Sequence, residues 1–447
     1  MELKDLLLAP LYLIIIYATA FWARSKYTNK FTKKYFIPAL SLKLGGAISL
    51  GLIYQFYYGP GTTVGGDTGN YYHQAKIILS AFEDSIDYGI RLFFSNGEFV
   101  SELRVYTKQM QWYKSPTEYF IIKTAAIFGI ISFGSYAVIA MMFAITSFSG
   151  LWVMFKTFLK IYPTLTKEFA IAIFFLPSVF FWGSGLMKDS LTLGALGWVF
   201  YGFYATFIEK KNILFNFLIL FAACYVIYVV KVYILLSFLP PALYWVFTEN
   251  NSRIKSGAIR ALVKPIFIAL GLVFAYLGAT IITAEDEKYS LDKIGERTRI
   301  NSVYLSEYQA SGSAYHIGTL DGSIGSMISV APQAIIVALY RPFLWEVRNP
   351  FMLLSAFEAL LFIFLTLKII LKVGIFKIIG FVTSKPIITF CITFSLIFAF
   401  GVGTNSGNFG TLVRYKIPLM PFYLSALYIM NAYLKRPRNT RRLAATE

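Results

Sequence analysis

Residues 213–248 read ILFNFLILFAACYVIYVVKVYILLSFLPPALYWVFT, an apolar stretch with one charge, Lys231, near its middle. About 20 apolar residues, each rising 1.5 Å, cross a hydrocarbon core of roughly 30 Å. The stretch therefore predicts two membrane-spanning helices, 213–230 and 232–248, that meet at Lys231. A charge inside a membrane is costly and usually faces a protein-lined cavity, or snorkels to the interface from a helix end. Lys231 is accordingly a candidate phosphate ligand, with snorkelling as the alternative.

The whole chain shares this character, because 57% of its 447 residues are apolar and only 14% are charged. Such a composition does not suit a water-exposed surface, so we expect an all-α transmembrane helix bundle that forms a single integral membrane domain over 1–447. Shorter apolar segments at 120–133, 324–340 and parts of 76–95 fit interfacial or re-entrant helices better. About eleven spans are predicted, at 6–23, 38–58, 136–156, 169–187, 190–208, 213–230, 232–248, 265–284, 350–367, 386–403 and 417–434.

The distribution of basic residues predicts the orientation. With 120–133 left on one side of the membrane, the stretches on one face carry 24 Lys and Arg against four acids. Under the positive-inside rule that face is cytoplasmic, which places the N-terminus outside and the C-terminus inside. The net charge of +18 is thereby explained without nucleic acid as a partner. Two large extracytoplasmic loops result, 59–119 and 285–349.

The first of these loops carries a carboxylate in a glycine-rich turn. Residues 58–72 read Tyr-Gly-Pro-Gly-Thr-Thr-Val-Gly-Gly-Asp-Thr-Gly-Asn-Tyr-Tyr, and the adjacent Gly65 and Gly66 let the backbone turn tightly before Asp67. Two interpretations of Asp67 are open. It is either the N-cap of a helix that begins near Asn70, or a general base that takes a proton from a sugar hydroxyl.

With Gly65, Asp67 and Tyr71 the chain resembles the GT-C superfamily of polytopic membrane glycosyltransferases, and in particular Wzy-like envelope polysaccharide polymerases. In that group a catalytic Asp lies early in the first outer loop, so the resemblance implies that Asp67 is catalytic and that Tyr71 lies near the substrate. It also implies an inverting sugar transfer in a bacterial inner membrane. One difference is the additional N-terminal helix, since GT-C proteins commonly start inside.

Residues 181–190, Phe-Trp-Gly-Ser-Gly-Leu-Met-Lys-Asp-Ser, join two apolar helices at the predicted outer surface. They resemble the helix hairpin that many such enzymes carry beside the active site, which implies that Lys188 and Asp189 lie near Asp67 and bind the substrate. The alternative is structural, with Ser184 and Asp189 capping helices and Lys188 snorkelling.

Residues 339–350, Leu-Tyr-Arg-Pro-Phe-Leu-Trp-Glu-Val-Arg-Asn-Pro, bring Arg341 and Glu346 to the outer surface. The planar guanidinium of Arg suits a phosphate, because it donates two parallel charge-assisted hydrogen bonds. A comparable Arg-Pro-aromatic-x-x-Glu stretch occurs in several envelope glycosyltransferase families. An ion pair between Arg341 and Glu346, with Trp345 in an aromatic belt, is the competing interpretation.

Residues 403–418, Gly-Thr-Asn-Ser-Gly-Asn-Phe-Gly-Thr-Leu-Val-Arg-Tyr-Lys-Ile-Pro, place Arg414 and Lys416 directly before the final span. Similar Arg-Tyr-x-x-Pro stretches precede the last helices of polysaccharide polymerases and GT-C enzymes, which implies substrate binding. Anchoring at the interface is the alternative, since Arg, Tyr and Lys favour that depth. We expect Arg341, Arg414, Lys188 and Lys231 to share one cavity.

The resemblance implies a glycosyltransferase or polymerase with a polyprenyl-phosphate-linked sugar donor, a glycan acceptor and the lipid bilayer as partners. No cofactor is expected. The two histidines, His73 and His316, lie in different loops without further ligands, and no second acid lies near Asp67 in the sequence, so a divalent cation is not indicated. The alternative function is a flippase or export component for an envelope polymer, which would place cations along a cavity at mid-membrane depth.

Overall fold

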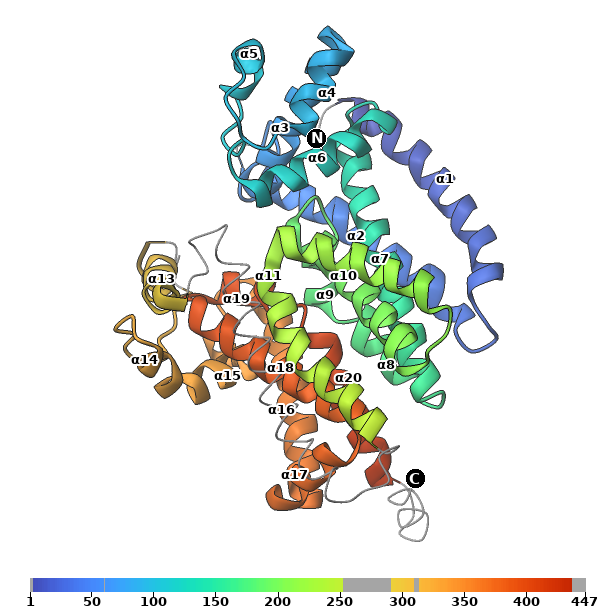
Figure 1. Cartoon of the computed structure of the whole chain (residues 1–447), viewed down its shortest axis with the longest axis vertical. Coiled ribbons are helices and arrows are strands. Elements are labelled where there is room, and N and C mark those ends of the chain that lie inside the picture. The colour runs from blue at the N-terminus through green and yellow to red at the C-terminus, as the bar shows by residue number, and fades with distance from the viewer. Residues whose placement is uncertain (1–2, 60, 252–290, 309–312, 436–447) are drawn as a thin grey trace. The chain divides into compact units, whose positions relative to one another are not determined.

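The structure, a computed structural model, describes residues 3–59, 61–251, 291–308 and 313–435 (Figure 1). In these ranges the regular elements are helices, and the only strand-like pairing is one antiparallel bridge between Ala314 and Asn408. The elements are α1 (Leu3–Tyr27), α2 (Lys33–Phe56), α3 (Gly66–Asp84), α4 (Ile86–Phe94), η1 (Ser101–Leu103), α5 (Arg104–Thr107), α6 (Pro116–Ile131), α7 (Tyr136–Ile161), α8 (Thr166–Phe174), α9 (Pro177–Trp182), α10 (Lys188–Phe203), η2 (Tyr204–Ile208), α11 (Ile213–Asn251), α13 (Leu291–Val303), η4 (Tyr304–Tyr308), α14 (Ile324–Ser329), α15 (Ala331–Tyr340), η5 (Leu344–Glu346), α16 (Pro350–Val373), α17 (Ile375–Ser384), α18 (Pro386–Asn405), α19 (Phe409–Tyr415) and α20 (Met420–Lys435).

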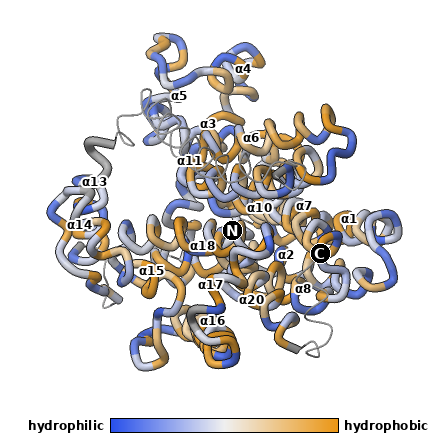
Figure 2. The backbone as a smooth tube through the Cα atoms, turned by 60° about the horizontal axis from the view of Figure 1, so that its bottom comes forward, coloured by the Kyte–Doolittle hydropathy of each residue, from blue (hydrophilic) through white to orange (hydrophobic). Residues whose placement is uncertain are grey.

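Within the described ranges, seven helices are long and apolar enough to cross a membrane, or eight if α19 and α20, bent by 70°, count as one span. The chain is therefore a multi-pass helical membrane protein. Figure 2 agrees, since most helices are coloured hydrophobic and many connecting turns hydrophilic. The predicted span 265–284 lies outside the described residues, and the full count of eleven stays a prediction.

One predicted span, 169–187, takes a different form in the structure. The segment 169–187 is not one continuous helix, because α8 ends at Phe174 and α9 begins at Pro177. Proline has no amide N–H to donate and disfavours helical backbone in the residue before it. As predicted, the stretch 213–248 forms two helices that meet at Lys231, where the backbone turns to φ −150° and ψ 69°, and both carry the label α11.

The described residues fall into two compact units. Unit 1 comprises Met1–Thr157, Val179–Gly202 and Phe217–Val232, and unit 2 comprises Phe158–Ser178, Phe203–Asn216 and Tyr233–Glu447. In unit 1, α3 packs along α6 and against α4, and α4 and α5 extend beyond α3 (Figure 1). Helices α7 and α10 approach closely at Gly150, Gly194 and Gly197, where an added Cβ would meet backbone atoms of the other helix. Small residues allow such close approach between membrane helices.

Lys43, one of the 24 basic residues counted on the predicted cytoplasmic face, lies inside α2. Its side chain is 1% exposed, and Nζ donates to Ser147 Oγ (3.1 Å), Val179 O (3.0 Å) and Gly183 O (2.7 Å). Buried polar groups need such partners, since an unpaired ammonium in an apolar interior is very costly. Even without Lys43, the predicted cytoplasmic face carries many more basic than acidic residues.

In unit 2, α18 packs against α15 and α20, and α16 packs against α20. The helix ends follow local sequence signals. Asn349 caps α16 by accepting from the N–H of Met352 (2.9 Å), and Asn408 caps α19 by accepting from Thr411 (2.8 Å). Pro350 and Pro386 occupy the first turns of α16 and α18, where no intrahelical donor is lost.

The N-terminal end of α1 contacts the start of α7. Asp5 is buried in α1 and accepts from Ser135 Oγ (2.5 Å) and from the N–H of Ala137 (3.3 Å) at the start of α7. The beginning of α1 and the beginning of α7 therefore lie on the same side of unit 1.

Cysteine labelling tests the predicted orientation. In a chain with Cys224→Ala and Cys391→Ala, we expect Ser101→Cys to react with a membrane-impermeant maleimide in intact cells, because it lies in the first large loop. Lys30→Cys, in the turn between α1 and α2, should react only after permeabilisation. Both positions are exposed. The reverse labelling pattern would contradict the N-out topology.

Candidate functional site

Five charged side chains come together in unit 1 from distant parts of the chain. We call Asp67, Glu118, Lys188, Asp189 and Lys231 the charged cluster. Lys188 forms an ion pair with Glu118, and Lys231 forms one with Asp189. Asp67 and Lys231 both lie close enough to Lys188 to act on its charge, Asp67 by attraction and Lys231 by repulsion.

The glycine-rich turn fixes the position of Asp67. Gly66 has φ +62°, and a Cβ there would meet the ring of Tyr54 at 2.6 Å. A Cβ at Gly69 would meet the carbonyl oxygen of Val64 at 1.9 Å, so both positions require glycine. The N-cap interpretation of Asp67 is wrong, because α3 begins at Gly66 with Gly65 at the N-cap, and Asp67 lies in the first turn.

Glu118 was not identified from the sequence, although it lies in the first turn of α6. One carboxylate oxygen accepts from Lys188 and the other from Ser115 Oγ. Burial acts to raise the pKa of Glu118, but the attraction of Lys188 and these hydrogen bonds outweigh it, so the pKa lies below its ordinary value. Glu118 is therefore ionised at neutral pH. Glu118 is thus a second acid near Asp67 in space, because both carboxylates interact with Lys188.

The pair of Lys231 and Asp189 is buried, with side chains 8% and 1% exposed. The pair of Lys188 and Glu118 is more accessible, with side chains 17% and 23% exposed. Lys231 lies at the break in α11, and the carbonyl oxygen of Val229 just before the break accepts from Thr117 Oγ1 (3.1 Å). Asp189 thus holds Lys231, and the accessible ammonium of the cluster is that of Lys188.

Three helices begin at the charged cluster. Asp67, Glu118 and Lys188 occupy the first turns of α3, α6 and α10, respectively. Helix N-termini carry partial positive charge and unpaired N–H groups, which favour anions. Lys188 and three helix starts therefore offer positive charge to an anion at this end of unit 1, while Asp67 and Glu118 supply carboxylates.

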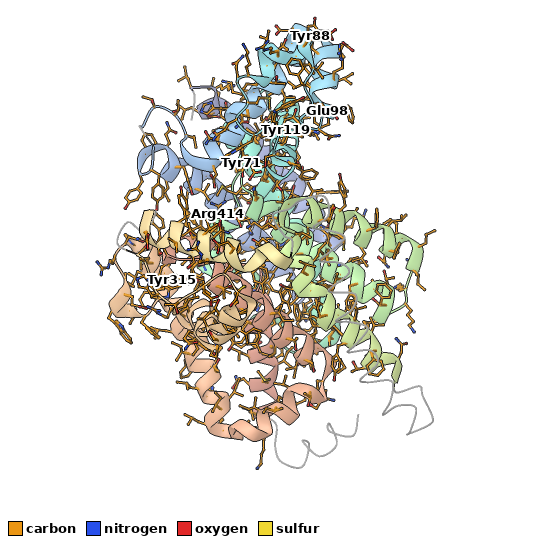
Figure 3. The ribbon with its side chains drawn as sticks, turned by 60° about the vertical axis from the view of Figure 1, so that its left-hand side comes forward. Tyr71, Tyr88, Glu98, Tyr119, Tyr315 and Arg414 are labelled. Carbon is orange, nitrogen blue, oxygen red and sulfur yellow. The ribbon has the colours of Figure 1, made fainter. Side chains whose placement is uncertain are left out.

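Tyr71 follows Asp67 by one turn of α3 but has a packing role. It is 2% exposed, and its ring lies 4.8 Å from that of Trp112. Figure 3 labels Tyr71 on α3 and Tyr119 on the neighbouring α6. Because Tyr71 is buried, the residues that cover its side chain separate it from a ligand at the surface.

In unit 2, Arg341 is engaged by Glu346. Its Nε lies 3.0 and 3.1 Å from the two carboxylate oxygens, and a second guanidinium nitrogen also donates to Glu346. The guanidinium lies over the rings of Phe409 (5.1 Å), Tyr315 (5.8 Å) and Phe343 (6.0 Å). The ion pair that the sequence offered as a structural alternative is thus present, supported by cation–π contacts.

Lys416 in unit 2 is also buried, at 1% exposed, and Nζ donates to the carbonyl oxygen of Arg341 (3.0 Å). Arg414 lies in the last turn of α19 and is half-buried; Figure 3 labels it together with Tyr315. Glu358 in α16 accepts from Ser178 N (2.7 Å) and Ser178 Oγ (2.5 Å). The cavity expected to join Arg341 and Arg414 with Lys188 and Lys231 involves both units and stays a prediction.

The pair of Arg341 and Glu346 predicts a pH dependence of stability. Burial acts to raise the pKa of Glu346, but hydrogen bonds from Arg341 and from the Phe343 N–H lower it overall. A depressed pKa means that the pair stabilises the fold at neutral pH and that this contribution is lost as pH falls through the folded-state pKa, below 4.5. We expect Glu346→Gln to melt below the wild type at pH 7 and the two melting temperatures to converge as the pH falls below 4.5. A difference in melting temperature between Glu346→Gln and the wild type that does not change with pH would contradict this.

The charged cluster combines ammonium groups, which can contact an anion, with carboxylates, which can accept a proton. Among the residues that the structure describes, no group of three His, Cys, Asp or Glu side chains is placed to hold a metal ion. In comparisons with known proteins, no family model, no curated protein and no solved structure matches the chain.

Proposed function

We propose that this chain is a membrane glycosyltransferase or polysaccharide polymerase that transfers sugar from a polyprenyl-phosphate-linked donor to a glycan acceptor. The reaction takes place on the extracytoplasmic face of a bacterial inner membrane, in cell-envelope or exopolysaccharide synthesis. The observation that carries the proposal is the charged cluster, in which Asp67 and an accessible Lys188 attract each other at the starts of two helices.

Asp67 is the general base of this reaction. The acceptor hydroxyl oxygen bonds to the anomeric carbon of the donor sugar, and its proton passes to the Asp67 carboxylate. The bond between the anomeric carbon and the phosphate oxygen breaks, and its electron pair leaves with the polyprenyl-linked phosphate. One base opposite one leaving group gives inversion at the anomeric carbon. General-base catalysis of this kind contributes about 10²–10⁴-fold in rate.

Lys188 stabilises the charge that develops on the leaving phosphate. Its ammonium is partly accessible and is shared between Glu118 and Asp67, so a phosphate oxygen can take the place of one carboxylate partner. Electrostatic stabilisation of a developing anion by a positioned cation is strong where water is excluded. Lys231 contributes positive potential while it stays paired with Asp189.

The distribution of cations in unit 1 favours surface chemistry over lipid translocation. A flippase needs cations along a cavity at mid-membrane depth. Lys43, which lies inside the span α2, is enclosed and already donates to three protein oxygen atoms. The accessible lysine of the charged cluster, Lys188, instead lies at the first residue of its helix.

The direct test uses purified protein in proteoliposomes that contain polyprenyl-linked donors extracted from cells grown on radiolabelled sugar. We expect the label to pass into a glycan and the polyprenyl phosphate to be released. Movement of intact labelled lipid across the bilayer without glycosidic transfer would support the flippase alternative and overturn the proposal. Vesicles without protein provide the background.

A further inference from the structure

The segment that leads into α6 places one tryptophan against α3, the helix that carries Asp67. The main-chain N–H of Trp112 donates to Gln74 Oε1 (2.9 Å), and Gln74 is itself buried in α3. The indole packs against Tyr71, with the ring centroids 4.8 Å apart and the planes tilted by 41°. Both the backbone and the ring of Trp112 are therefore held on α3.

The ring against which Trp112 packs lies one helical turn from Asp67. Tyr71 follows Asp67 by four residues on α3, so the two lie on the same side of the helix, about 6 Å apart along its axis. Farther along the same segment, Glu118 is the ion-pair partner of Lys188, which is attracted by Asp67. The stretch from Trp112 to Glu118 is thus related to Asp67 at both ends. Its indole packs on the ring one helical turn from Asp67, and its carboxylate pairs with the lysine that Asp67 attracts.

Exposure distinguishes the rings of Tyr71 and Trp112. Tyr71 is buried, whereas Trp112 keeps part of its surface accessible. A pyranose ring has an apolar C–H face and a rim of hydroxyl groups, so it is best held by a flat aromatic surface beside a hydrogen-bonding group. A partly exposed indole that packs one helical turn from a carboxylate offers this combination, and large rigid rings give much contact area for little loss of conformational entropy.

We propose that Trp112 is the sugar-binding platform of the site. Its indole stacks on the C–H face of the acceptor's terminal sugar and holds the hydroxyl of that sugar within hydrogen-bond reach of Asp67. This inference rests on the proposed function and deepens it by naming the residue that binds the acceptor ring. Tyr71 and Gln74 act as positioning residues, because they fix the indole and its backbone.

The test measures acceptor binding and sugar transfer separately. The probes are oligosaccharides prepared by partial acid hydrolysis of the host cell's own envelope polysaccharide, titrated into purified protein and followed by calorimetry. The variants are Trp112→Leu, which keeps an apolar side chain, and Trp112→Phe, which keeps a smaller ring. Trp345→Leu is the matched control, because Trp345 is 81% exposed and lies in unit 2.

We expect Trp112→Leu to weaken oligosaccharide binding and raise the acceptor KM about tenfold. The donor KM should not change, Trp112→Phe should lose less, and Trp345→Leu should resemble the wild type. Unchanged oligosaccharide binding in an actively transferring Trp112→Leu protein would overturn the role of Trp112 and leave the proposed function standing. A Trp112→Leu protein with a lower melting temperature but normal acceptor binding would likewise show that the indole only packs. A wild-type protein that transfers no sugar would overturn the proposed function itself.

Discussion

Replacement of Asp67 by asparagine is expected to lower the rate of sugar transfer about 10²–10⁴-fold, with nearly normal expression and melting temperature. Asparagine has nearly the same shape and keeps a hydrogen-bonding oxygen, but it does not accept the proton of the attacking hydroxyl. The glycine-rich turn and the start of α3 do not depend on the charge. The loss should therefore appear in kcat, measured as radiolabelled sugar transferred in proteoliposomes.

The matched control is Glu83→Gln, which neutralises another exposed acid of α3 near the opposite end of the helix. It should transfer sugar at the wild-type rate. If Asp67 only stabilised the positive end of α3, its replacement would cost about 0.3–1 kcal/mol of stability and leave transfer intact. A fully active Asp67→Asn protein with a lowered melting temperature would establish that structural role and exclude the catalytic one.

Replacement of Lys231 by methionine is expected to destabilise unit 1 by about 3–5 kcal/mol, because it leaves the Asp189 carboxylate buried without its partner. Asp189 is 1% exposed, so water does not solvate the remaining charge. The measurement is thermal unfolding of the detergent-solubilised protein, with the yield of monodisperse protein as a second readout.

The double variant Lys231→Met with Asp189→Leu should recover most of that loss, since an apolar pair of similar volume often replaces a buried ion pair without penalty. Lys188→Met is the comparison within the same cluster. Its pair with Glu118 is partly exposed, so the loss of stability should be smaller, while transfer should fall sharply because the leaving phosphate loses its cation. Equal destabilisation by both single substitutions would contradict the assignment of a sealed and an accessible pair.

Local sequence signals predicted much of the helical plan. Apolar stretches of span length mark α1, α2, α7, α10, α16 and α18, and the charge in 213–248 marks the break in α11. The break between α8 and α9 was missed because average hydropathy over 169–187 hides the local effect of Pro177. The burial of Lys43 could not be predicted, because hydropathy does not show that three oxygen atoms from distant parts of the chain accept hydrogen bonds from its ammonium.

The candidate site was only partly predictable, since its contacts join residues far apart in the chain. A glycine-rich turn identifies Asp67 locally, and an intramembrane lysine implies some partner for Lys231. Neither signal identifies Asp189 as that partner, 42 residues away, or Glu118 as the partner of Lys188, 70 residues away. Arg341 and Glu346 are the opposite case, because only five residues separate them and the sequence could offer their pair as an alternative.

The hydrogen bonds of Lys43 impose an order on the biogenesis of the protein. An Lys near the centre of a spanning helix costs about 2.5–3.5 kcal/mol on the insertion scale. The oxygen atoms that offset this cost belong to Ser147, Val179 and Gly183, and the last of them is 140 residues downstream. Until α7 and the 179–183 segment are in the membrane, these oxygen atoms cannot accept from the ammonium, and the cost of Lys43 is carried by the remaining apolar residues of α2.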